Sequence, residues 1–177
     1  MVDLTSVKNN LNDTLQESVL SLTEEHGHII FEILPNAIVD VVTYIKSKKG
    51  LSFTTLIDIT AIDFPAKEKR FELIYHFLSM TENIRCKIVT SISDQETVNS
   101  VTSVFECANW FEREIFDLFG IKFSSHPDLR RILTDYGFEG HPLRKDFPTT
   151  GFLEVRYDEV EKRVIYEPTT LTQGYRD

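Results

Sequence analysis

Three segments in the middle of the chain carry the pattern that most restricts its fold. Residues 71–78 and 84–90 place apolar side chains at every second position, and residues 53–62 are rich in Thr and Ile. A period of two indicates a strand that faces the core on one side. The polar turn at residues 65–69 predicts an antiparallel hairpin between the strands at residues 53–62 and 71–78. Together the segments predict a mostly antiparallel sheet.

The segments before these strands predict two helices and a further strand. Residues 3–22 have apolar side chains at helical spacing, so we expect an amphipathic helix that ends by Gly27. Residues 29–34 alternate as a strand does, and Asn36 can then cap a second helix. The buried face of that helix is expected to consist of Ile38, Val41, Val42 and Ile45.

A third helix is predicted after the strands. Ser93 and Glu96 have the spacing of a capping box, which starts helices. Its buried stripe would consist of Val98, Val101, Val104, Phe105 and Ala108. It leads into residues 110–119, which also have helical periodicity and are stopped by Gly120. Helices on a mostly antiparallel sheet make a two-layer α+β domain, which we place at residues 1–123.

The regular pattern fails from about Ser124 onward. Short apolar pieces such as residues 163–166 lie among Pro, Gly and charged residues. A loop-rich tail of this length is far longer than compact domains normally contain. A segment that buries little apolar surface of its own is ordered by what it binds. We therefore expect residues 124–177 to be an extended, partner-binding C-terminal arm.

Residues 109–148 contain the only Trp of the chain and an unusual block of charge. On the predicted helix, charged side chains crowd the face opposite the apolar one. Two His-Pro steps follow, at residues 126–127 and 141–142, and both favour extended or turning backbone. Acidic and basic residues then interleave without a regular period. This pattern indicates a recognition surface rather than a core.

Three motifs in this stretch resemble one known family. They are ERExxDxFGI at residues 112–121, HPDLRRIL at residues 126–133 and GHPLRKDFP at residues 140–148. The family is the 30 kDa subunit of respiratory complex I, the proton-pumping NADH:ubiquinone oxidoreductase. Bacteria name it the C subunit, and it is NADH dehydrogenase subunit 9 where mitochondria encode it. The dense match runs from about Ala108 to Pro168.

The resemblance implies a cofactor-free structural subunit in the hydrophilic arm of that complex. It implies contact with the 49 kDa quinone-site subunit and with iron–sulfur subunits, while FMN and the iron–sulfur clusters belong to those partners. The expected location is peripheral, on the matrix side of the mitochondrial inner membrane or on the cytoplasmic face of a bacterial plasma membrane. A related membrane-bound hydrogenase or a chloroplast NDH-type complex, which share this subunit, is the alternative.

The charged and aromatic residues of the motifs are the candidate partner interface. Arg pairs bidentately with carboxylates, and Arg together with aromatic residues is typical of interface centres. The candidates are Glu112, Arg113, Glu114, Asp117, His126, Asp128, Arg130, Arg131, His141, Arg144, Asp146 and Phe147. Arg113 and Asp117 lie four residues apart and can pair along the helix. Glu112 and Glu114 are expected to pair with Arg113 and the later Arg residues. Arg144 is expected to meet a carboxylate at an interface.

Composition and motifs exclude several other functions. A net charge of −9 argues against a nucleic-acid or anionic-membrane partner. No apolar run approaches the ~20 residues that span a bilayer. Cys86 and Cys107 cannot hold an iron–sulfur cluster alone, because such a cluster usually needs four thiolates.

No active site of the chain's own is expected. The sequence has no G-x-S-x-G nucleophile motif, no G-x-G-x-x-G loop and no Walker loop. We therefore predict no catalytic, cofactor-binding or metal-binding residue. One alternative from another class is a metal-dependent hydrolase. Its ligands would be Glu114, Asp117, His126 and His141, although their spacing matches no tight metal motif.

Overall fold

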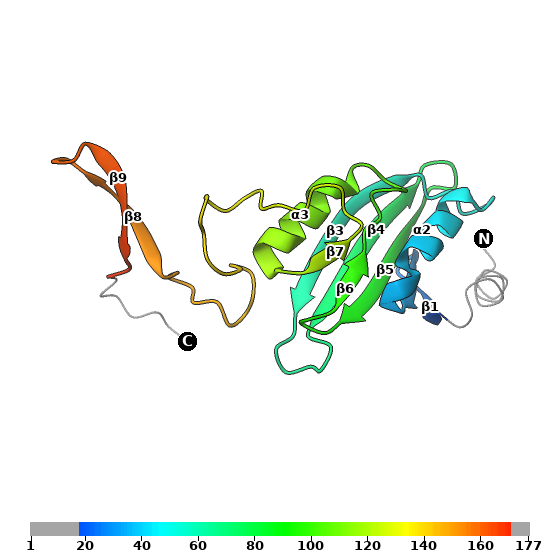
Figure 1. The fold of residues 1–177 in the computed structure, drawn as a ribbon. Helices are drawn as coiled ribbons and strands as arrows, with labels where there is room; N and C mark the ends of the chain where they lie inside the picture. Colours follow the sequence, from blue (N-terminus) through cyan, green and yellow to red (C-terminus); the bar gives the residue numbers. More distant parts are fainter. Residues whose placement is uncertain (1–17, 171–177) are drawn as a thin grey trace.

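A five-stranded sheet forms the body of the protein (Figure 1). The computed structural model describes residues 18–170. The strands are β1 (Val19–Glu25), β2 (His28–Ile33), β3 (Thr55–Asp63), β4 (Phe71–Ser79) and β5 (Ile84–Ile92). Their order across the sheet is β1-β2-β5-β4-β3, and all neighbours are antiparallel except the parallel pair β2 and β5. The predicted sheet and its β3–β4 hairpin are confirmed.

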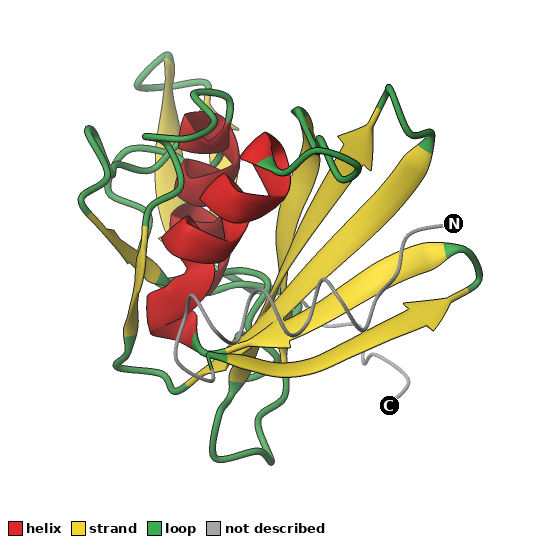
Figure 2. Ribbon diagram, turned by 90° about the vertical axis from the view of Figure 1, so that its right-hand side faces the viewer, coloured by secondary structure: helices red, strands yellow, loops and turns green. Residues whose placement is uncertain are grey.

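Two α-helices among the described residues cover one face of this sheet (Figure 2). α2 (Ile38–Ser47) follows the short 3-10 helix η1 (Pro35–Ala37), and α3 (Ala108–Phe119) packs against β3. The predicted two-layer α+β architecture is confirmed. The predicted cap at Asn36 is wrong, because Asn36 lies inside η1 and no side-chain hydrogen bond caps α2. No helix of the described residues is long and apolar enough to cross a membrane.

The core lies between the sheet and the helix layer. Every second side chain of β4 is buried, and so is one face of α2. Burying an aliphatic or aromatic side chain of this size stabilises a fold by ~1.5–3 kcal/mol. The residues are Phe71, Leu73, Tyr75 and Phe77 on β4, and Ile38, Val41, Val42 and Ile45 on α2. The periodicity of the sequence therefore predicts these core positions correctly.

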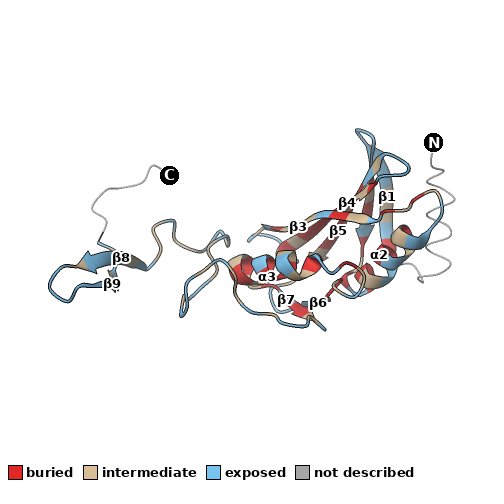
Figure 3. Ribbon diagram, turned by 90° about the horizontal axis from the view of Figure 1, so that it is seen from above, coloured by how far each residue is buried: buried red, intermediate tan, exposed pale blue. Residues whose placement is uncertain are grey.

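Two smaller strand pairs lie outside the main sheet. β6 (Thr97–Asn99) pairs in parallel with β7 (Lys122–Ser124) shortly after α3. β8 (Leu153–Asp158) and β9 (Arg163–Pro168) form an antiparallel hairpin. This hairpin projects away from the sheet and is mostly exposed (Figure 3). The segment between β7 and β8 instead hydrogen-bonds to α3 and β3. The predicted division between residues 123 and 124 stays a prediction.

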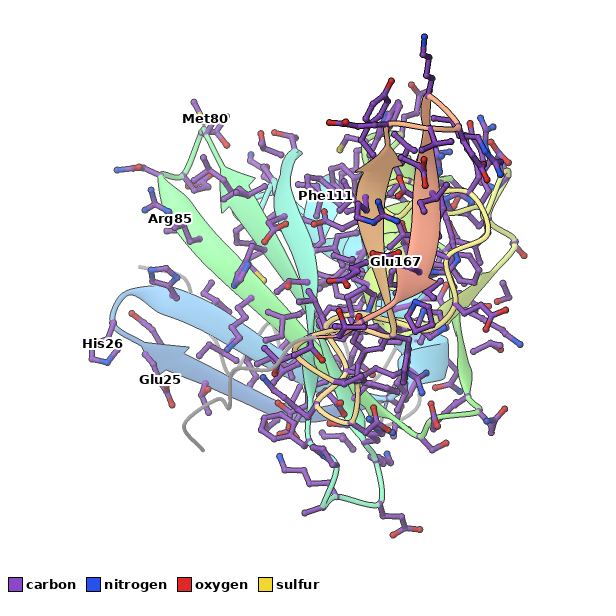
Figure 4. All side chains as sticks on the ribbon, turned by 90° about the vertical axis from the view of Figure 1, so that its left-hand side faces the viewer. Glu25, His26, Met80, Arg85, Phe111 and Glu167 are labelled. Atoms are coloured by element: carbon purple, nitrogen blue, oxygen red, sulfur yellow. The ribbon has the colours of Figure 1, made fainter. Side chains whose placement is uncertain are left out.

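The first strand corrects one prediction. The helix expected at residues 3–22 lies mostly outside the described residues, and from Val19 onward the chain is strand instead. His26 and Gly27 both have positive φ, 52° and 76°, which suits the tightest connection between antiparallel strands. Pairing with β2 therefore overrides the helical spacing. Figure 4 shows Glu25 and His26 at this turn, at the same end of the sheet as Arg85.

Residues 93–107 contradict the predicted third helix. Ser93 and Glu96 do interact, since the Ser93 backbone N–H and hydroxyl donate to Glu96 Oε2 at 3.1 and 3.4 Å. They close a turn, however, and the chain continues as β6. Val98 pairs there with Phe123 of β7, because β-branched residues pack well on a pleated surface. The residues expected on the helical stripe are buried or partly buried all the same.

Replacing Ile59 by Ala should lower the free energy of unfolding by ~2–5 kcal/mol, because this buried residue would leave a cavity. Ile57→Ala is the matched control on the same strand. Ile57 lies at a β-bulge and the residue is 45% exposed, so the same truncation should cost under ~1 kcal/mol. Urea unfolding followed by circular dichroism measures both losses. Equal losses would contradict the assignment of the buried face of β3.

Candidate functional site

The last of the three motifs, residues 140–148, caps the C-terminal end of α3. Gly120 ends the helix with φ +79°, and its N–H donates to Phe116 O at 3.0 Å. The next three backbone carbonyls have no donor within the helix. Each accepts a hydrogen bond from the last motif instead. The His141 Nδ1–H donates to Asp117 O (2.9 Å), the Leu143 N–H to Leu118 O (3.0 Å) and the Arg144 Nε–H to Phe119 O (2.6 Å). Residues 141–144 therefore replace the missing helical turn.

Asp117 organises the middle motif from inside the protein. Its side chain is fully buried, and its carboxylate accepts five hydrogen bonds within 3.0 Å. The donors are Arg131 Nη1, the Thr134 hydroxyl and the backbone N–H groups of Ile132, Leu133 and Thr134. Burial alone would raise the pKa of Asp117, but the hydrogen bonds outweigh it and hold the pKa below its ordinary value. The carboxylate is therefore ionised at neutral pH.

The Arg113 side chain binds the backbone carbonyls of the same loop. Its Nε donates to Arg130 O at 3.1 Å and its Nη2 donates to Arg131 O at 3.2 Å. The expected pair between Arg113 and Asp117 is therefore wrong. An exposed pair along a helix contributes only ~0.3–0.5 kcal/mol, whereas the loop offers both residues partly buried hydrogen-bond partners. Both side chains consequently turn toward residues 130–134.

A second anchor joins the last motif to the base of the β3–β4 hairpin. Arg70 donates from Nε and Nη2 to both oxygens of the buried Asp63, at 2.7 and 2.8 Å. It also pairs with Asp146 at 2.9 Å, and the Lys145 backbone N–H donates to Asp63 Oδ2 at 2.7 Å. The hydrogen bonds from Arg70 are the main reason why the pKa of Asp63 lies below its ordinary value. This anchor fixes where the chain leaves the domain.

Sequence reasoning missed Asp63 and Arg70 as site residues. The available signal is the alternation along β3, which puts Asp63 on the buried face with Ile59 and Ala61. A buried carboxylate needs a partner, so its position indicates one. Which residue supplies that partner depends on the turn that returns Arg70 to it. Asp94, which pairs with Arg144 at 2.9 Å, gives no such signal.

The structure corrects part of the predicted partner interface. Glu112, Asp117 and the ring of His126 are fully buried, so their side chains cannot contact a partner directly. The expected ion pairs of Glu112 are wrong as well, since its Oε1 accepts from the Val101 backbone N–H. Arg144 meets a carboxylate of its own chain, Asp94, rather than one at an interface. The three motifs thus join the chain to itself.

Apart from the buried Arg113, the remaining candidates are at least partly accessible. Glu114 is exposed, and Asp128 and Arg130 form an exposed pair at 2.8 Å. Phe147 stacks edge-on against Phe152, with ring centroids 5.5 Å apart. The other partly accessible candidates are Arg131, His141, Arg144 and Asp146. Their contact with a partner stays a prediction.

The ligands proposed for a metal-dependent hydrolase do not meet. Glu114 is exposed, Asp117 binds the 131–134 loop, His126 faces Asn109 and His141 caps α3. Within residues 18–170, no group of three or more His, Cys, Asp or Glu side chains could hold a metal ion. The geometry therefore gives this alternative no support.

Gly120→Ala should lower the free energy of unfolding by more than ~2 kcal/mol. An added Cβ would lie 2.6 Å from His141 Nε2 and 2.8 Å from Arg144 Nη2, and φ is positive. Gly137→Ala is the matched control, because it has φ +80° but nothing within 4 Å of the added Cβ. It should show only the backbone strain of ~1 kcal/mol. Thermal unfolding of both variants separates the two effects, and equal losses would contradict the packed cap.

Asp117→Asn should lower the free energy of unfolding by about 3 kcal/mol at neutral pH, because Arg131 loses its buried ionic partner. The pKa of Asp117 lies below its ordinary value of 3.8, so its contribution is present above that pH and lost on further acidification. The difference from the wild type should therefore shrink below about pH 4. Asp128→Asn, in an exposed pair, should change stability by less than ~0.5 kcal/mol. Urea titrations at several pH values test this, and a pH-independent difference would contradict it.

Comparisons with known proteins agree with the motifs. Residues 31–153 match the family described as respiratory-chain NADH dehydrogenase, 30 Kd subunit. The NADH-quinone oxidoreductase C subunits of Cereibacter sphaeroides and Ruegeria pomeroyi are each 55% identical over 160 residues, covering 90% of this chain and 80% of the relative. The corresponding C subunit of Xanthobacter autotrophicus is 48% identical over 168 residues, covering 95% and 80%.

A solved structure shares the fold. It is a chain of the membrane-bound sulfane sulfur reductase, an archaeal respiratory membrane complex. The TM-score is 0.68 at 23% sequence identity, and the match covers 81% of this chain and 85% of that chain. At this identity the likeness concerns the fold alone.

Proposed function

Because the chain belongs to the family of the 30 kDa subunit of respiratory-chain NADH dehydrogenase, we propose that it is a scaffold subunit in the peripheral arm of a proton-translocating NADH:quinone oxidoreductase. The complex carries electrons from NADH to quinone, and this chain positions the subunits that do so. FMN and iron–sulfur clusters belong to those partners. In support, Asp117, Arg131, Arg144 and Asp146 of the motifs all form ion pairs within the chain. Correct spacing matters, since a misplacement of about 1 Å can cost ~100-fold in rate.

The partners in this proposal are the 49 kDa quinone-site subunit and the iron–sulfur subunits. The chain is peripheral to the membrane and attached through these subunits. The named relatives are bacterial, which favours the cytoplasmic face of a bacterial plasma membrane over the mitochondrial inner membrane. The fold shared with an archaeal reductase does not favour a different parent complex, because it concerns the fold alone.

The observation that carries the scaffold role is the two-faced β8–β9 hairpin. Val155 lies opposite Tyr166 and Tyr157 lies opposite Val164, so apolar residues share one face. Each of them is more than half exposed, as is Leu153 beside them. The other face is charged, with Arg156 donating to Glu167 at 3.0 Å. A two-stranded hairpin is marginally stable in water on its own, and a contiguous apolar face indicates a docking surface.

The capped end of α3 determines where this hairpin starts. Phe147 directly follows Lys145 and Asp146, which are bound by Asp63 and Arg70, and it packs against Phe152, one residue before β8. At the other strand, the Tyr166 hydroxyl donates to Asp135 Oδ2 at 3.3 Å. Asp135 follows the residues bound by Asp117. The domain therefore presents the hairpin from a fixed base, as a scaffold role requires.

Val155→Lys should lower the amount of assembled complex at least tenfold. Docking would bury the new charge and lose the burial of Val155, and ~1.4 kcal/mol already corresponds to a tenfold change in association. Glu154→Lys is the matched control, because the adjacent residue receives the same side chain on the charged face. Blue-native gel electrophoresis of membranes carrying each variant measures assembly.

The isolated chain provides the second control. Val155 is 57% exposed, so both variants should melt within about 1 °C of the wild type. Equal assembly of the two variants would contradict docking through the apolar face. Normal assembly with a large loss of NADH oxidation per complex would contradict the scaffold role itself.

A further inference from the structure

Glu112 is a fully buried carboxyl group with only one of its oxygens hydrogen-bonded. Its Oε1 accepts from the Val101 backbone N–H at 2.8 Å. Its Oε2 is buried and has no hydrogen-bond partner among the described residues. An unpaired buried carboxylate is costly, so such a group gains a proton or a donor.

Among the described residues, the one basic side chain within 4 Å of Glu112 Oε2 is His126. The ring of His126 is also fully buried, and its Nδ1 accepts from the Asp128 backbone N–H at 3.0 Å. This contact assigns the ring proton to Nε2. Nε2 lies 3.3 Å from Asn109 O and 3.9 Å from Glu112 Oε2. The Nε2–H therefore has two acceptors within a small movement of the ring.

We propose that Glu112 and His126 form a buried proton-binding site, and that its occupancy decides which acceptor the His126 Nε2–H uses. When Oε2 carries the proton, the carboxyl is neutral and Nε2–H donates to Asn109 O, as in the structure. When the proton leaves for solvent water, the electron pair of the broken O–H bond stays on Oε2. The carboxylate then accepts from Nε2–H. His126 keeps its own proton, so a single proton moves.

The surroundings of Glu112 favour uptake of that proton at near-neutral pH. Burial raises the pKa of Glu112 to about 7, against the opposing hydrogen bonds from Ser100 and Val101. From β4, the buried Tyr75 faces the site, and burial together with Glu112 raises its pKa. The nearest cation on α3, Arg113, is directed to the carbonyls of residues 130 and 131. On β3, Asp63 is bound by Arg70.

The site is connected to the loop that Asp117 and Arg113 hold. His126 begins the segment that leads to Arg130 and Arg131, whose carbonyls accept from Arg113. A shift of the ring from Asn109 toward Glu112 moves the start of that segment relative to α3. Binding of the proton therefore changes how the loop is attached to α3. This proposal does not depend on the scaffold function.

The full chain, labelled with ¹³C and ¹⁵N, provides the test by NMR. The side-chain carboxyl carbon of Glu112 should titrate with a midpoint near pH 7. The His126 Nε2–H resonance should move with the same midpoint while the ring stays in the Nε2–H tautomer. Glu112→Gln should abolish the movement, and Glu114→Gln, on the exposed side of α3, should leave it.

A second readout follows from linkage. The folded-state pKa of Glu112 is above its ordinary value of 4.5. Its contribution to the free energy of unfolding is therefore complete below about pH 4.5 and is lost as the pH rises to about 7. The melting temperature of the wild type should therefore fall relative to Glu112→Gln between about pH 4.5 and 7, and the difference should level off above that range. Two results overturn the proposal. One is a Glu112 carboxyl already ionised at about pH 5, and the other is a His126 Nε2–H that does not respond to the Glu112 titration.

Discussion

A buried, ionised carboxylate at the end of a helix is the constraint on which the C-terminal half of this chain depends. Asp117 lies in the last turn of α3, where the helix macrodipole disfavours negative charge by ~0.3–1 kcal/mol. Burial adds a larger cost. Five donors from residues 131–134 offset both, and they can do so only if the loop takes one conformation. The charge therefore selects the loop, and the loop in turn brings His141 and Arg144 to the open carbonyls of the same helix end.

The same physics explains why the motifs resemble an interface in the sequence. An alternation of Arg and Asp on irregular backbone indicates buried ion pairs, because exposed pairs contribute little and impose no such order. The alternation does not say whether the partners of these ion pairs belong to the same chain or to another one. Here Asp94 supplies the partner for Arg144 from within the domain, far away in the sequence, and Asp63, which pairs with Arg70, also accepts from the distant Lys145 backbone N–H. Only the fold brings them close, so the sequence alone could not assign them.

Local periodicity predicts the parts of the fold in which burial and secondary structure agree. The alternation of Phe71, Leu73, Tyr75 and Phe77 has one interpretation, and so does the helix that Gly120 ends. The failures are segments in which tertiary pairing overrides a helical pattern. β1 is strand because the turn at His26 and Gly27 folds it onto β2, and β6 is strand because β7 is available to pair with it. Sequence reasoning places the charged residues of α3 on an exposed face, since a buried Glu112 or Asp117 requires a neighbour that no local pattern contains.

In the proposed scaffold role, the ordered base after α3 and the apolar β8–β9 hairpin have different tasks. Association costs less when the binding segment is ordered beforehand, because fewer conformations are lost on docking. Residues 130–147 are ordered by contacts within the chain, so their conformational entropy is lost on folding and not on assembly. The β8–β9 hairpin, which we propose as the docking surface, has an exposed apolar face. An unprotected face of this kind also promotes aggregation, and the charged opposite face with its Arg156–Glu167 pair limits stacking on that side. The order of residues 130–147 and the exposed apolar face of the hairpin are thus separate properties, and different residues of one short segment determine them.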